Sequence, residues 1–274
     1  MTKTVALVEN TKLSKELYAK HGLCLYIETP EHKILFDLGP DDTFAKNAEK
    51  LGIDIKAVDT VVISHGHKDH GGGLSTFMKM NSIAKIYIRK TAFEPHYIKL
   101  LKIPFSVSLD KSLARSERFI FTDDNHIIDD ELLLFSNVKS SEYHSKSNDV
   151  LFAKKANSLI IDSFDHEQNL IITSANNRIL ISGCSHSGIV NIQKEAERIA
   201  KNKMSYVIGG FHLFNPPTKK TENNKLIDDI AGALNKNKSI YYTCHCTGVR
   251  VYEQMKETLK NKLLYLSTGT KLEL

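Results

Sequence analysis

The chain has 274 residues, 41% of them hydrophobic, so it can bury a full core, and one domain is its simplest organisation. Its net charge of +5 comes from lysines interspersed with acidic residues, which argues against nucleic-acid binding and leaves room for an anionic small-molecule substrate. The sequence has no bilayer-spanning apolar run, no secretory signal and only four cysteines, so we expect a cytoplasmic protein without disulfides or a membrane partner.

The first part of the chain is expected to be strand-rich. Strands are predicted over residues 4–9, 23–29 and 33–37, and a helix over 42–51. The apolar run over 58–64 then predicts a buried strand, because it continues with one polar break up to a sharp change in composition.

This strand ends in the strongest motif of the chain, His65-Gly66-His67-Lys68-Asp69-His70, followed by three glycines and a predicted helix over 74–80. Neutral imidazole and carboxylate are nitrogen and oxygen ligands that zinc prefers. His65 and His67 alternate and can point to one side of an extended turn, while Asp69 and His70 face a second position. One loop can therefore supply ligands to two adjacent metals. A polar loop with chance histidines is the weaker interpretation, because residue type, spacing and flanking elements agree.

The middle of the chain is expected to be less regular. A strand over 84–89, a helix over 93–102, and strands over 118–122 and 131–135 are predicted, and residues 104–157 are interpreted as an insertion. Its polar loop over 139–149 either covers the active site or is a tolerated surface insertion. The histidines of this region are interpreted as ordinary surface residues; they are His96, His126 and His144.

In the second half, strands alternate with helices, which favours α/β layering. The predicted elements are strands over 169–173, 178–182, 204–208, 239–243 and 263–266, a turn at Asn176-Asn177, and helices over 189–201, 226–234 and 249–259. Three of these strands end in polar motifs, namely Gly183-Cys184-Ser185-His186, Gly209-Gly210-Phe211-His212 and Cys244-His245-Cys246.

The pattern His-x-His-x-Asp-His-Gly-Gly after an apolar strand resembles the signature of the metallo-β-lactamase superfamily. The resemblance implies an α/β protein with an αββα sandwich and metals between its two sheets. Together with Glu9-Asn10 and His21-Gly22, the three strand-end motifs resemble the dihydropteroate-synthase-like or pterin-ribofuranosylaminobenzene-phosphate-synthase-like branch. The likeness spans nearly the whole chain, with a gap between about residues 90 and 157.

The resemblance implies two divalent metal ions, zinc before iron or manganese. Carried over by motif, the first would bind to His65, His67 and His186, and the second to Asp69, His70 and His245. In the superfamily, an Asp-x-Gly at the place of Asp37 is usually a structural turn, so Asp37 is expected to support the site without ligating metal.

The sequence departs from the superfamily at Cys184, where many members carry a bridging aspartate. The thiolate of Cys184 either replaces that carboxylate or is a small packing residue. If Cys184 aligns with the aspartate, His186 is a less certain ligand, and a member of Asp165-His166-Glu167 could contribute instead. Cys244 and Cys246 are interpreted as packing cysteines.

These residues predict a dinuclear hydrolase for a small phosphorylated or cyclic metabolite, which the branch resemblance extends to a pterin-related one. Asp69 is the expected catalytic residue, because it can orient a bridging water and accept its proton. His212 is expected to bind substrate in the cleft or to orient a ligand. The alternatives are a metal-binding or sensing protein without turnover and a nucleic-acid phosphodiesterase. The oligomeric state is left open.

Overall fold

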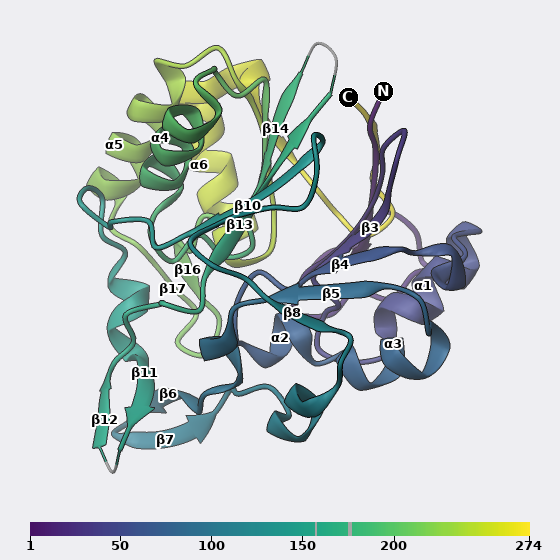
Figure 1. The fold of residues 1–274 in the computed structure, drawn as a ribbon. Coiled ribbons are helices and arrows are strands. Elements are labelled where there is room, and N and C mark those ends of the chain that lie inside the picture. The colour runs from purple at the N-terminus through teal and green to yellow at the C-terminus, as the bar shows by residue number, and fades with distance from the viewer. Residues whose placement is uncertain (157, 175–176) are drawn as a thin grey trace.

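The computed structural model describes residues 1–156, 158–174 and 177–274, and it contains two seven-stranded sheets that pack face to face (Figure 1). Asn157, at the end of the predicted insertion, and Asn176, in the predicted turn, lie outside the described residues. In sheet order, the first sheet comprises β20 (Lys271–Glu273), β1 (Lys3–Val8), β2 (Cys24–Glu28), β3 (Lys33–Phe36), β4 (Thr60–Val62), β5 (Lys85–Ile88) and β8 (Phe119–Phe121). The second comprises β19 (Leu263–Tyr265), β18 (Ile240–Thr243), β15 (Tyr206–Gly209), β14 (Arg178–Ile181), β13 (Gln168–Thr173), β10 (Leu132–Ser136) and β9 (Asn125–Ile127).

The strands near the centre of the sheets are apolar on both faces because both faces are covered. In β3, Ile34 and Phe36 pack in the cluster between the sheets, which also contains Leu134 of the second sheet. The alternate residue Leu35 packs instead with Phe44 of an outer helix. Burying one such side chain contributes about 1.5–3 kcal/mol, so both faces of the strand stabilise the fold.

Helices cover the outer face of each sheet (Figure 1). The first sheet carries α1 (Thr43–Leu51) and α3 (Leu74–Met80), and the second carries α4 (Ile189–Ala200), α5 (Asn224–Asn235) and α6 (Val249–Leu259). This is the predicted αββα arrangement. Among the described residues, none of the helices has the length and apolar character needed to cross a membrane.

The prediction of a helix over residues 93–102 is wrong. The 3₁₀ helix η2 (Lys90–Phe93) leads into β6 (His96–Leu100), which forms a hairpin with β7 (Ile103–Ser106). Leu101 and Lys102 turn the chain with positive φ angles of 50° and 70°. The short run of alternating residues fits a strand as well as a helix, and pairing with β7 and with β11 (Leu151–Lys155) decides between them.

The hairpin belongs to a third, four-stranded sheet in the order β12-β11-β6-β7, with β11 (Leu151–Lys155) and β12 (Ser158–Ile161). The interpretation of His96 as a surface residue is also wrong, because its side chain is buried in this region. Two short strands, β16 (Phe214–Asn215) and β17 (Lys220–Thr221), form a separate pair. Whether residues 104–157 are an insertion in a single domain stays a prediction.

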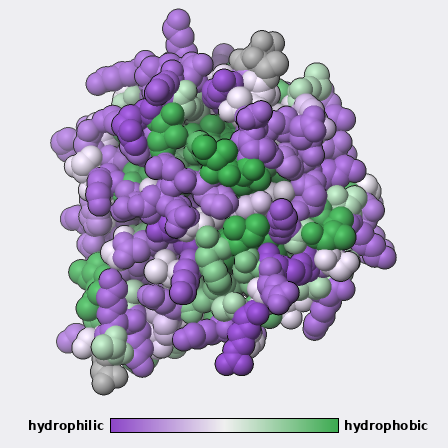
Figure 2. All heavy atoms as spheres, viewed as in Figure 1, coloured by the Kyte–Doolittle hydropathy of each residue, from purple (hydrophilic) through white to green (hydrophobic). Residues whose placement is uncertain are grey.

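On the face shown in Figure 2, hydrophilic side chains surround a few separate apolar patches. Long basic and acidic side chains pair in places, as in Lys194–Glu142 at 2.6 Å and Lys225–Asp229 at 2.6 Å. Such exposed pairs contribute little to stability, but they spread the charge of both signs over the surface.

Candidate metal centre

The predicted metal loop follows the buried strand β4, as expected. The short helix α2 (Lys68–Gly71) begins directly after His67 and turns the chain, so that Asp69 and His70 reach a second position beside His65, whose ring centroid lies 4.1 Å from that of His70. His65 and His70 are fully buried, and Asp69 keeps a quarter of its side chain exposed.

Three histidines form the first ligand cluster, and they are the three predicted for the first metal. The ring centroids of His65, His67 and His186 lie 4.6, 4.9 and 5.1 Å apart pairwise. The Nε2 atom of each ring is buried without a hydrogen-bond partner among the described residues. Because buried imidazole nitrogens are normally paired, three unpaired ones on neighbouring rings fit a bound cation. Ligand atoms of His65 and His186 lie within 4.8 Å of each other, and His67 also lies within this distance of Asp162 and His166.

The protonation of these rings suits metal binding. The other ring nitrogen of His65 lies 2.8 Å from Ser64 Oγ, and that of His186 lies 2.9 Å from Asn148 Oδ1. Donation from Nδ1–H to these oxygens leaves the lone pair of Nε2 free. Burial, together with the neighbouring histidines, lowers the pKa of His65 and of His186 well below the usual value, so both rings are neutral near pH 7.

The second cluster contains Asp69, His70 and His245, as predicted. The Nε2 atoms of His70 and His245 lie 3.2 Å apart, and Asp69 Oδ2 lies 3.8 and 3.4 Å from them. Burial would raise the pKa of Asp69, but His70, His21 and His245 outweigh it and hold the pKa well below the usual value. The carboxylate is therefore ionised, and His21 Nε2 contacts it at 3.2 Å.

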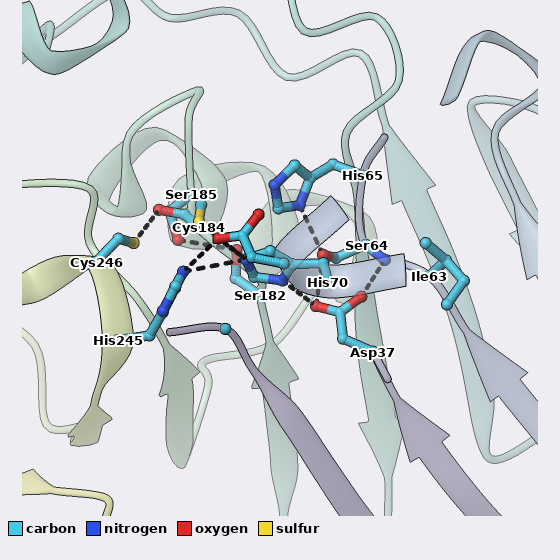
Figure 3. Close-up of polar contacts among 12 residues, drawn as sticks. Asp37, Ile63, Ser64, His65, His70, Ser182, Cys184, Ser185, His245 and Cys246 are labelled. Carbon is cyan, nitrogen blue, oxygen red and sulfur yellow. Dashed lines mark hydrogen bonds and ion pairs between the residues drawn. The ribbon is translucent and has the colours of Figure 1, made fainter. Parts of the chain in front are cut away.

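Cys184 lies between the two clusters. Its Sγ atom is 3.2 Å from His70 Nε2 (Figure 3) and also lies within 4.8 Å of ligand atoms in His65, His186 and His245. This is the location expected of a bridging ligand. The structure thus brings Cys184 and His186 into the site together, so one does not replace the other.

Of the three other candidates from the same segment, only His166 borders a cluster, because its ring nitrogen lies within 4.8 Å of that of His67. Asp165 is exposed. His166 is buried beside the loop, where its Nδ1 accepts the backbone N–H of Gly66 at 3.0 Å. Its Nε2 lies 3.3 Å from Asp162, which also contacts His96 Nδ1 at 2.8 Å. This buried group fastens the ligand loop to the third sheet.

Asp37 supports both clusters from behind, as predicted. It accepts hydrogen bonds from the backbone N–H of Ser64 at 2.7 Å, from Ser64 Oγ at 2.7 Å and from His70 Nδ1 at 2.6 Å (Figure 3). Since Ser64 Oγ also contacts His65, one buried carboxylate orients a ligand ring of each cluster.

Two further carboxylates hold the loops of the second sheet. Glu9 Oε1 accepts the backbone N–H of His245 at 2.7 Å, and Glu167 Oε1 accepts that of His186 at 2.6 Å. Asn10 Oδ1 lies 3.1 Å from His245 Nδ1. The sequence assigned none of these roles, although Glu9-Asn10 was part of the resemblance and Glu167 was an alternative ligand.

A cavity of about 530 Å³ opens onto the clusters. Its lining includes Asp69, Lys68 and His212 on the polar side, and Ile98 and Leu151 of the third sheet on the apolar side. The loop over 139–149 lies against the site, because Asn148 Nδ2 donates to the carbonyl of His186 at 2.9 Å. The interpretation of this loop as an active-site cover is therefore favoured over a mere surface insertion.

This fold and this site define a metallo-β-lactamase fold protein, and the predicted resemblance to that superfamily is confirmed. The model of the metallo-beta-lactamase superfamily matches residues 17–143. A protein of Methanocaldococcus jannaschii, named 7,8-dihydropterin-6-methyl-4-(beta-D-ribofuranosyl)-aminobenzene-5'-phosphate synthase, is 27% identical over 270 residues, covering 92% of this chain and 89% of the relative. The name of this relative is that of the branch that the motifs of this chain resemble.

Solved structures of metallo-β-lactamase fold proteins superpose on this chain. The chain superposes with a TM-score of 0.84 on Tm1679, a metal-dependent hydrolase of the beta-lactamase superfamily, at 27% identity and covering 100% of this chain and 99% of that one. Zn²⁺-bound PqqB from Methylobacterium extorquens has a TM-score of 0.61 at 10% identity, covering 99% and 100% of the two chains. This second likeness shows the fold alone.

Proposed function

We propose that the protein is a dinuclear metal-dependent hydrolase, with zinc as the first candidate metal, that acts on a small phosphorylated or cyclic metabolite of pterin-related type. The observation that carries the proposal is the pair of ligand clusters facing one cavity, one of them with three unpaired buried Nε2 atoms. The name of the M. jannaschii relative supports the pterin-related class.

In this proposal, His65, His67 and His186 hold one ion, and Asp69, His70 and His245 hold the other. Ions bound there would supply a nucleophile near neutral pH and would polarise the bond that is attacked. Cys184 contributes a thiolate between the two clusters.

The protein's own groups provide positioning and proton transfer. Asp69 lines the cavity with an exposed, ionised carboxylate, so it can orient the attacking water and accept its proton. His21 holds this carboxylate from the other side. Lys68 lines the same cavity and places a cation within reach of an anionic substrate group, while His212 faces the cavity from the second sheet.

The test combines metal analysis with turnover. Protein purified without added metal is assayed for bound ions and for hydrolysis of p-nitrophenyl phosphate, bis-p-nitrophenyl phosphate and a lactone. We expect two ions per chain in the two clusters, and we expect His65→Ala to lose at least one ion and nearly all activity. His144→Ala is the matched control, because His144 is exposed. Full occupancy of the clusters in His65→Ala would contradict the ligand assignment, and metal-loaded protein without turnover would favour a metal-binding or sensing role.

Synthase chemistry on a pterin is the second candidate, because the M. jannaschii relative carries a synthase name. To separate the two candidates, the metal-loaded protein is incubated with the substrates of a synthase reaction, and the mixture is analysed for the dihydropterin compound that the relative's name gives as its product. Product formation without hydrolysis of any ester or lactone would reverse our preference.

A further inference from the structure

A third group of metal-type ligands adjoins the two clusters and includes Cys246, to which the proposed hydrolysis gives no role. The ligand atoms of Cys184, His212 and Cys246 lie within 4.8 Å of one another, and all three residues are buried. The three residues follow β14, β15 and β18, which are parallel neighbours in the second sheet. Because the carboxyl ends of parallel strands meet at one edge, the topology itself brings two sulfurs and an imidazole together.

His212 is the unusual member of this group. Its side chain is 92% buried, yet neither Nδ1 nor Nε2 has a hydrogen-bond partner among the described residues. Buried polar atoms are normally hydrogen-bonded, and the His212 ring leaves two of them unpaired among the described residues. One of these nitrogens is paired if it binds a ligand that the protein alone does not supply.

The backbone around the group is shaped to let the sulfur approach. A Cβ atom on Gly210 would lie 2.4 Å from Cys246 Sγ, so only glycine fits at this position. The backbone N–H of His212 donates to Cys246 Sγ at 3.3 Å. A hydrogen bond from the main chain stabilises negative charge on sulfur, which is the form in which cysteine binds metal.

We propose that Cys184, His212 and Cys246 form a binding site for a soft, thiophilic cation beside the two ligand clusters. Two thiolates and one imidazole select zinc or copper(I) over magnesium and manganese. The site shares only Cys184 with the two clusters, so it can be emptied without removing any of their histidine or aspartate ligands. This inference goes beyond the proposed hydrolase and does not depend on turnover.

The test counts ions and thiolates in metal-free, reduced protein titrated with cadmium chloride. Bound cadmium is measured by elemental analysis, and sulfur ligation by the ultraviolet charge-transfer absorption of cadmium thiolate. We expect three ions per chain in the unaltered protein, and two in Cys246→Ser with about half of the thiolate absorption lost. His212→Ala should weaken the third ion at least tenfold while keeping both thiolates, which provides a second variant if Cys246→Ser folds poorly.

Cys244→Ser is the matched control, because Cys244 is equally buried and two residues away but packs in the apolar cluster between the sheets. It should retain three ions. Equal numbers of bound ions in the unaltered protein and in Cys246→Ser would overturn the proposal. Failure of the hydrolase proposal gives a different result: ions are missing from the His65 and His70 clusters, while the Cys246-dependent ion is still bound. Offering one equivalent of copper(I) to zinc-loaded protein distinguishes the cations. Copper(I) uptake that depends on Cys246, with or without release of one zinc, indicates a copper(I) site, and no copper uptake with the third zinc retained indicates a zinc site.

Discussion

Replacing Asp37 with asparagine tests how the protein orients its ligands. Three donors point at the two oxygens of Asp37, namely the N–H and the hydroxyl of Ser64 and the Nδ1–H of His70. Asparagine has one oxygen, and its NH₂ group must face at least one of these donors. The backbone itself should accept the change, because Asp37 has a φ of 58° and asparagine tolerates this left-handed conformation.

The expected loss has two parts. In the variant, the NH₂ group of residue 37 favours the His70 tautomer with its proton on Nε2, which cannot ligate metal. Loss of such a supporting partner typically lowers metal affinity 10–100-fold, or about 1.4–2.8 kcal/mol. One charge-assisted hydrogen bond to a buried carboxylate is also lost, which should lower the free energy of unfolding of the metal-free protein by about 1.5–3 kcal/mol.

Zinc competition titration against a chelator measures the affinity, and urea unfolding of metal-free protein measures the stability. Asp110→Asn is the control, because Asp110 is exposed and its side chain accepts hydrogen bonds from Ser112 within its own 3₁₀ turn. We expect Asp37→Asn to bind metal better than His65→Ala but to be less stable. Metal loss equal to that of His65→Ala, or an unchanged affinity, would refute the reasoning.

Three further predictions concern His67, Cys184 and His32. His67→Ala should lose at least one ion and nearly all activity while the circular dichroism spectrum is kept; full metal content would refute its assignment. Cys184→Ser should lower zinc content, because serine is a poor zinc ligand, whereas Cys24→Ser should not; equal content in both would make Cys184 a packing residue. His32 contacts Asp59 at 3.1 Å and Asp129 at 2.6 Å; burial would lower its pKa, but these two aspartates outweigh burial and raise it. The charged His32 therefore stabilises the folded protein below about pH 6.5, and this stabilisation is lost as the pH rises through the raised pKa. After allowing for solvent screening, His32→Gln should lower the free energy of unfolding by about 0.5–1 kcal/mol at pH 5.5 and by much less at pH 9. Urea unfolding at both pH values measures it, and an equal cost at both would contradict the assignment.

The fold and the ligand loops could be predicted because their signals are local. A strand such as β3, buried on both faces, gives a continuous apolar run, and a ligand loop gives a change from apolar to polar residues at the strand end. The segment around β6 lacks such a signal. Its partner β11 lies some fifty residues further along the chain, so whether residues 96–100 form a strand is decided by pairing and not by the segment itself.

The supporting carboxylates could not be predicted for the same reason. Glu9 accepts the N–H of His245 across 236 positions of the sequence, and nothing near Glu9 indicates that contact. A buried carboxylate is costly unless it is fully hydrogen-bonded, and Asp37, Glu9 and Glu167 each meet that condition by binding a backbone N–H in or next to a ligand residue. None of these bonds uses the Nε2 atom that would hold a metal. The ligand loops are therefore held by the protein's own hydrogen bonds, and the same three carboxylates that would be unfavourable in the core are what make the site rigid.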